Sequence, residues 1–133
     1  MFLNKLDIES KKVFLQLAHH VARSDDSFSD MQKMLIGGYL KEMSISDVEY
    51  NKATFSVAKC IKNITDKEYQ KIILIEILAI VYTDNLMHPA EKEIIDTIVD
   101  TWSINSSLVV VYGEWSRSLL SLYIQGEALL ELN

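Results

Sequence analysis

Two short acidic segments hold the residues of this 133-residue chain whose types and spacing best suit chemistry. The first contains Asp25, Asp26 and Asp30, and the second contains Asp84 and Glu91. Hard divalent cations bind oxygen ligands, so carboxylates that converge on a loop predict a calcium or magnesium site. The spacing is not that of an EF-hand, because neither segment has the required glycine at position 6 or glutamate at position 12.

The same acidic residues have a structural interpretation. Asp and Glu are favoured as caps and in the first turn of a helix, where they accept backbone N–H groups and meet the positive end of the helix dipole. A further alternative is enzymatic, because His88 lies beside Asp84 and Glu91 and an imidazole next to carboxylates suits acid–base catalysis in a small hydrolase. The sequence has no Gly-rich phosphate loop, HExxH motif or Ser-His-Asp order, so we expect a non-enzymatic protein.

Charge and cysteine content narrow the function classes. The formal net charge is −6, which argues against nucleic-acid binding because that rests on Lys and Arg neutralising phosphates. Cys60 is the only cysteine, so the chain has neither an internal disulfide nor a cysteine-built zinc site. Cys60 lies on the apolar stripe of a predicted helix, where a buried thiol is inert.

Helices must position all of these residues, since apolar side chains recur at steps of three and four along most of the chain. We predict helices over residues 7–23, 30–43, 46–63, 65–83, 89–102 and 107–130, the last with a bend at Gly113. Ser46 with Glu49 and Thr65 with Glu68 have the spacing of capping boxes. Gly37 and Gly38 predict either the close approach of a neighbouring helix or a local kink.

The most apolar window argues against membrane insertion. Ile72–Tyr82 is 11 residues long and contains Glu76, whereas a spanning helix needs roughly 20 apolar residues. This window predicts a buried core helix. No signal peptide is recognised at the N-terminus, so we expect a cytoplasmic protein without a transmembrane segment.

A weak internal repeat organises the chain. An offset of 59 residues places Asp7 on Asp66, Asp25 on Asp84 and Ser44 on Ser103. We therefore predict a single domain over residues 1–133, an all-α compact bundle of about six or seven helices, built from two pseudo-repeated three-helix units at 7–65 and 66–124. The first unit has no net charge and the second has −5, so a cation or basic partner is expected to prefer the second.

With both acidic helix–loop–helix segments in view, the chain resembles the tellurite-resistance TerB-like domain family. The residues that carry the resemblance are Ile77–Ile104 (ILAIVYTDNLMHPAEKEIIDTIVDTWSI) and the weaker Leu17–Leu40. The resemblance implies an all-α fold in two pseudo-repeated halves, a place in stress-response systems, and a cation- or partner-binding surface at Asp25, Asp84 and Glu91. The chain departs from the family at Gln32, which replaces the expected acid in the first half.

Together these observations predict a non-enzymatic helical interaction module with an acidic surface that binds a divalent cation, linked to a tellurite-type stress response. Its expected partners are proteins. The alternatives are a purely structural adaptor or a homodimer without metal, for which Leu119–Leu130 supplies an apolar interface, and the hydrolase that uses His88 and Glu91.

Overall fold

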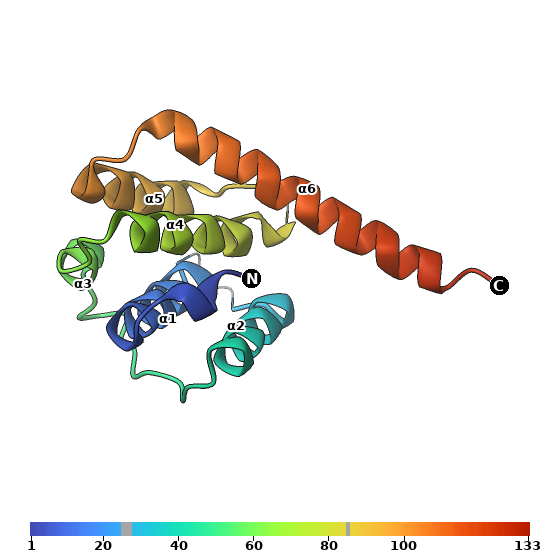
Figure 1. Cartoon of the computed structure of the whole chain (residues 1–133), viewed down its shortest axis with the longest axis horizontal. Helices are drawn as coiled ribbons and strands as arrows, with labels where there is room; N and C mark the ends of the chain where they lie inside the picture. The colour runs from blue at the N-terminus through green and yellow to red at the C-terminus, as the bar shows by residue number, and fades with distance from the viewer. Residues whose placement is uncertain (25–27, 85) are drawn as a thin grey trace.

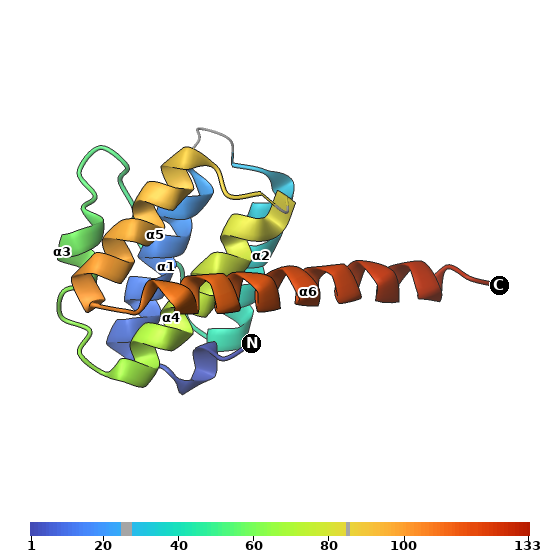
Figure 2. The same ribbon diagram turned by 90° about the horizontal axis from the view of Figure 1, so that it is seen from above.

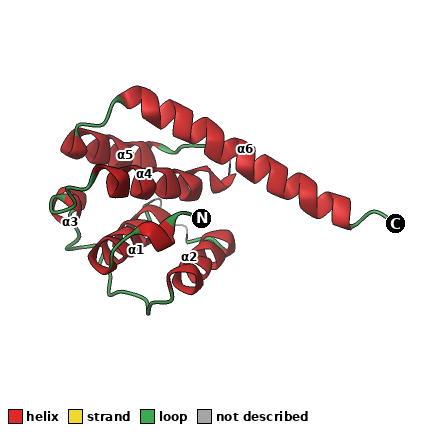
Figure 3. Cartoon of the chain, in the orientation of Figure 1, coloured by secondary structure: helices red, strands yellow, loops and turns green. Residues whose placement is uncertain are grey.

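Helices are the only regular structure in the part of the chain that the computed structural model describes, residues 1–24, 28–84 and 86–133, with Asp84 described by its backbone only (Figure 3). The expected all-α bundle is confirmed. Within the described residues no helix is both long enough and apolar enough to span a bilayer. The elements are η1 (Leu3–Lys5), α1 (Ile8–Ala22), α2 (Asp30–Met43), α3 (Val57–Ile61), α4 (Lys67–Val81), η2 (Tyr82–Asp84), α5 (Pro89–Trp102) and α6 (Ser106–Leu130), where η marks a 3₁₀ helix.

Local caps set where the helices begin. The Asp7 carboxylate accepts the Ser10 backbone N–H at 2.8 Å and starts α1, and Asp66 caps α4 in the same way. Each bond satisfies one of the backbone donors that a helix N-terminus leaves free. Two serines with left-handed backbone conformations end α2 and α5, Ser44 at φ 53° and Ser103 at φ 52°.

α4 is the central helix of the fold. It packs against α1 on one side and α6 on the other, and it also contacts α5 and η1. Figure 1 shows this as layers, with α1 and α2 beneath α4 and α5, and α6 across the top. The side chains of Ile73, Leu74 and Ile77 are fully buried. The prediction of a core helix at Ile72–Tyr82 is therefore confirmed.

The predicted helix over residues 46–63 is wrong, because only Val57–Ile61 is helical there. Ser46 and Glu49 form no capping box; instead the neighbouring Asp47 binds the side chain of His19 on α1. Tertiary contacts with α1 hold this segment in an irregular conformation that local propensity does not favour. The second predicted box is also wrong, since Asp66 and not Thr65 caps α4.

The glycine predictions also need correction. A Cβ atom added at Gly37 or Gly38 would meet nothing within 4 Å, so no neighbouring helix in the described structure approaches them. Gly113 lies inside a continuous α6 and is buried. A Cβ atom there would lie 3.0 Å from the Tyr82 ring, so Gly113 permits the close contact between α6 and η2.

The 59-residue offset relates four of the helices. α1 and α4 begin and end 59 residues apart, and so do α2 and α5. The third helices differ, since α3 has 5 residues and α6 has 25. Two equivalent three-helix units are therefore not confirmed.

Candidate functional site

The acidic residues of the first predicted loop fall mostly outside the described structure. Asp25 and Asp26 are not among the described residues. Asp30 is the first residue of α2, and its side chain is fully exposed, 3.9 Å from the ammonium group of Lys33. This position at a helix N-terminus matches the capping interpretation of the acidic residues.

Glu91 has a structural role in the second segment. It is 3% exposed, and its Oε1 accepts the backbone N–H of His88 at 2.9 Å. Gln32 does the same in α2, where its Oε1 accepts the Ser29 N–H at 3.0 Å. Glutamine serves as well as glutamate in a capping box. Gln32 and Glu91 are equivalent positions under the 59-residue offset, and this shared capping role explains why glutamine can replace the acid in the first half. The side chain of Asp84 lies outside the described structure.

His88 stands at the N-cap of α5 and is half-buried. Its backbone N–H donates to Glu91 Oε1, so the two residues of the alternative acid–base pair lie together at the start of α5. Among the described side chains, no three His, Cys, Asp or Glu residues gather in a group able to hold a metal ion. Asp25, Asp26 and the Asp84 side chain lie outside the described structure, so the cation site stays a prediction.

A polar network that the sequence did not indicate joins α1 to the segment before α3. His19 Nε2 lies 2.7 Å from Asp47 Oδ1, and His19 Nδ1 lies 2.6 Å from the Arg23 guanidinium. Arg23 can only donate, so Nδ1 accepts and Nε2 carries the hydrogen that Asp47 accepts. Both ring nitrogens of His19 thus have hydrogen-bond partners within the protein. The bond between His19 and Asp47 attaches the segment before α3 to α1.

His20 extends this network on the next position of α1. Its Nδ1 lies 2.6 Å from the Tyr50 hydroxyl, and its ring packs on Phe55 with 4.7 Å between centroids. Burial, with a smaller contribution from the charge of Lys52, lowers the pKa of His20. The neutral imidazole is therefore favoured in the folded protein.

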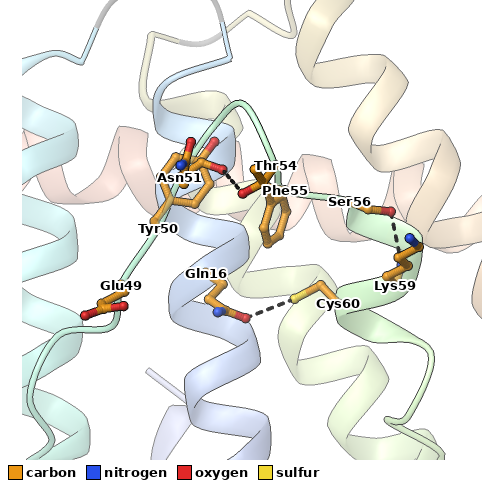
Figure 4. Close-up of a pocket in the computed structure, with 9 residues that line it drawn as sticks. All are labelled: Gln16, Glu49, Tyr50, Asn51, Thr54, Phe55, Ser56, Lys59 and Cys60. Atoms are coloured by element: carbon orange, nitrogen blue, oxygen red, sulfur yellow. Dashed lines mark hydrogen bonds between the residues drawn. The ribbon is translucent and has the colours of Figure 1, made fainter.

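A hollow of about 820 Å³ lies beside this network, lined by α1, α3 and the segment between α2 and α3 (Figure 4). Figure 4 shows Gln16 of α1 and Cys60 of α3 in contact in its lining, where the thiol donates to Gln16 Oε1 at 3.4 Å. Burial raises the pKa of the Cys60 thiol to about 11. The thiol is protonated at neutral pH and is a poor nucleophile, so the hollow does not present a reactive cysteine.

Two glutamates hold the N-terminal segment against the helices. Glu76 Oε1 of α4 lies 2.9 Å from both the Met1 amine and the Phe2 backbone nitrogen. Glu42 of α2 accepts the Met1 amine at 2.9 Å and the Leu3 N–H at 3.0 Å. Burial and the two carboxylates raise the pKa of the neighbouring Tyr39 hydroxyl. In the sequence, Glu76 was visible only as an interruption of an apolar window.

The most exposed apolar surface belongs to the second half of α6. Figures 1 and 2 show that this half extends beyond every other element, and the C-terminus lies far from the body. Only Gly113 and Ser116 of the helix are buried. The large apolar side chains exposed along it include Leu119, Leu122, Tyr123, Ile124, Leu129 and Leu130.

Comparisons with protein-family models, with curated proteins and with solved structures found no match to this chain. The resemblance to the TerB-like family is therefore untested by them.

Proposed function

We propose that this chain is a non-enzymatic helical interaction module that binds a protein partner through the second half of α6. The observation that carries the proposal is the apolar surface of that half, where Leu122 is 62% exposed and Leu129 is 66% exposed. Fully burying a leucine side chain contributes about 1.5–3 kcal/mol, so a partner that covers several of them gains substantial binding energy. Large exposed apolar patches mark interaction sites in soluble proteins.

The isolation of this half also supports a partner. A helix segment of this length without tertiary contacts is marginal in water, because most helical stability in proteins comes from packing an apolar face. The first half of α6 has such packing: Gly113 contacts Tyr82, and the Trp115 ring lies 5.9 Å from the Phe2 ring. The second half of the helix has exposed side chains at every position from 121 to 125 and from 127 to 130. A partner surface supplies the missing packing.

The cellular role that we propose, a part in a stress-response complex, rests on the TerB-like resemblance of Ile77–Ile104. The matching bounds of α1 with α4 and of α2 with α5 support an internal duplication, as that resemblance implies.

A photo-cross-linking residue at Leu122 tests the interaction in intact cells. We expect covalent adducts from Leu122 and few from the same residue at Glu93, which is exposed on α5. Adding Leu119→Asp to the cross-linking chain is expected to abolish the adducts, because a charge on the apolar surface prevents desolvation. Adducts that are absent at Leu122, or that survive Leu119→Asp, contradict the proposed function.

Divalent-cation binding by the acidic loops is a separate part of the proposal. Titration calorimetry with calcium and with magnesium, followed by thermal melting, is expected to show heat and a raised melting temperature that Asp84→Asn removes. Glu91→Gln preserves the cap, as Gln32 does in α2, so a loss of heat in this variant would indicate that the Glu91 carboxylate is itself a ligand rather than a cap alone. The absence of heat with either ion would contradict cation binding. It would not bear on the proposed binding of a protein partner through α6.

A further inference from the structure

We propose that the partner of α6 is a second copy of this chain, and that the two α6 helices lie antiparallel along one uncharged seam. This inference rests on the proposed function, since it names the occupant of the same surface. Three observations carry it: the spacing of the seam, the absence of charge along it, and the match of large and small residues between its two ends.

The seam follows a heptad pattern. Steps of three and four residues alternate along α6 through Tyr112, Trp115, Leu119, Leu122, Gly126 and Leu129. An apolar residue at alternating steps of three and four places one narrow stripe on a helix, which is the packing surface of a two-stranded coiled coil. Trp115 is 39% exposed and Leu119 is 36% exposed where the stripe leaves the body, and Leu129 at its far end is 66% exposed.

Charge selects a second copy over a charged partner. The charged residues of α6 are Glu114, Arg117 and Glu127, and all three lie away from the stripe and its flanks. The flanking positions hold Ser116, Ser118, Tyr123, Gln125 and Leu130. A chain with a net charge of −6 repels its own copy, so self-association requires an uncharged contact face, which this stripe provides. A basic protein or an anionic lipid surface would find no ionic group there.

The sizes of the side chains select the antiparallel orientation. When two copies run antiparallel with Leu119 opposite Leu122, Trp115 of each copy lies opposite Gly126 of the other. A parallel pair would instead set tryptophan against tryptophan and glycine against glycine, which leaves a crowded layer and an empty one.

Gly126 has no other evident role in this structure. A Cβ atom added there would meet nothing within 4 Å, and glycine is unfavourable inside a helix. Space for the Trp115 ring of a second copy gives the glycine a packing function.

The length of α6 allows this pairing. The overlap from Tyr112 to Leu129 measures about 26 Å at 1.5 Å per residue. The body of each copy packs on the first half of its own α6, through α4 and η2, so the two bodies occupy opposite ends of the helix pair. The projecting half seen in Figure 2 is then covered by the first half of the partner helix. Such a contact is isologous and closes as a twofold dimer.

Sedimentation of the purified full-length chain over a range of concentrations tests the pairing. We expect a dimer, and we expect Leu122→Asp to raise its dissociation constant by roughly 100-fold or more, because each dimer then buries two unpaired carboxylates. Ile124→Asp is the matched control. It changes a neighbouring apolar residue that is 57% exposed on the opposite side of the helix, so the dimer should persist. Circular dichroism checks that both variants are folded.

Disulfide trapping tests the register. In a Cys60→Ser background, a chain with Leu119→Cys is mixed with a chain with Leu122→Cys and oxidised. The antiparallel register predicts disulfides between the two variants in preference to disulfides between two copies of the same variant. A preference for disulfides that join two Leu119→Cys chains, or two Leu122→Cys chains, indicates a parallel pair and overturns the register.

The outcomes separate this inference from the proposed function. A monomer at all concentrations, or a dimer that Leu122→Asp leaves intact, overturns the self-pairing. Cross-links from Leu122 to a different protein then still support the interaction module. A monomer without any Leu122 cross-link contradicts both.

Discussion

Glu76 and Glu91 are 6% and 3% exposed, and hydrogen bonds to backbone N–H groups explain the burial of both carboxylates. A buried polar group that accepts a hydrogen bond recovers part of the free energy that it loses with its hydration. His19 follows the same logic, since Asp47 and Arg23 occupy its two nitrogens. At the scale of single residues, these buried polar groups therefore stabilise the fold.

His20 makes a pH prediction at this scale. Its pKa is lowered in the folded protein, so the unfolded chain takes up a proton first as the pH falls below about 6.5. The free energy of unfolding is then expected to decrease with falling pH. His20→Gln, which keeps a hydrogen-bonding group beside Tyr50, should show a smaller decrease in urea unfolding between neutral and acidic pH. Equal decreases in both proteins would show that His20 does not contribute.

At the scale of elements, Gly38 of α2 and Gly113 of α6 differ in how closely other parts of the protein approach them. Gly38 lies on the exposed face of α2 with nothing within 4 Å of an added Cβ atom, whereas Gly113 has the Tyr82 ring at 3.0 Å. Glycine costs conformational entropy in any helix interior. Only at Gly113 does a close approach of another element compensate for that cost.

Alanine at each glycine tests this difference. We expect Gly38→Ala to raise the free energy of unfolding by about 0.5–1 kcal/mol, because alanine is the better helix former. Gly113→Ala is expected to lower it by about 1–2 kcal/mol, because overpacking against Tyr82 outweighs the propensity gain. Urea unfolding measures both. A gain at Gly113 would show that α6 shifts on η2 at little cost.

At the scale of the whole molecule, the N-terminal segment ties two helices together. The Met1 amine lies between Glu42 of α2 and Glu76 of α4. Burial alone would lower the pKa of this amine, but its bonds to Glu42 and Glu76 raise it above 8.0. The arrangement joins Met1 to Glu42, which is 41 positions further along the chain, and to Glu76, which is 75 positions further along it.

Glu76→Gln tests the tie. We expect it to lower the free energy of unfolding by about 1–2 kcal/mol, since a charged hydrogen-bond partner is lost while Gln still accepts the Phe2 N–H. The raised amine pKa means that its stabilisation is complete below pH 8.0 and is lost as the pH rises above that value. Urea unfolding of the wild type should show this loss, and Glu76→Gln should show less of it.

Glu68→Gln is the matched control on the same helix. Glu68 is 67% exposed and 3.9 Å from Lys5. A surface pair of this kind contributes about 0–1 kcal/mol, so little change is expected. Equal effects of the two substitutions would contradict a specific role for Glu76.

Particular residues show how far the sequence determined this protein. The long periodic stripes placed α1, α2, α4, α5 and α6 close to their observed bounds, because helical periodicity and caps such as Asp7 act within a few residues. Periodicity and capping spacing also predicted a helix over 46–63. In the structure, contacts with α1 hold most of that segment in a non-helical conformation. The capping interpretation of the acidic residues agrees with Glu91 and with the position of Asp30.

Only the tertiary structure decided which distant groups meet. Three contacts join positions that no spacing rule relates. They are those of Asp47 with His19, of Gly113 with Tyr82, and of Glu76 with the Met1 amine. It also decided that the second half of α6 leaves the body, although its apolar residues were visible from the start. Local interactions choose helices, because their energies depend on neighbours in sequence. Packing chooses which helix faces are covered, because that energy depends on the whole chain at once.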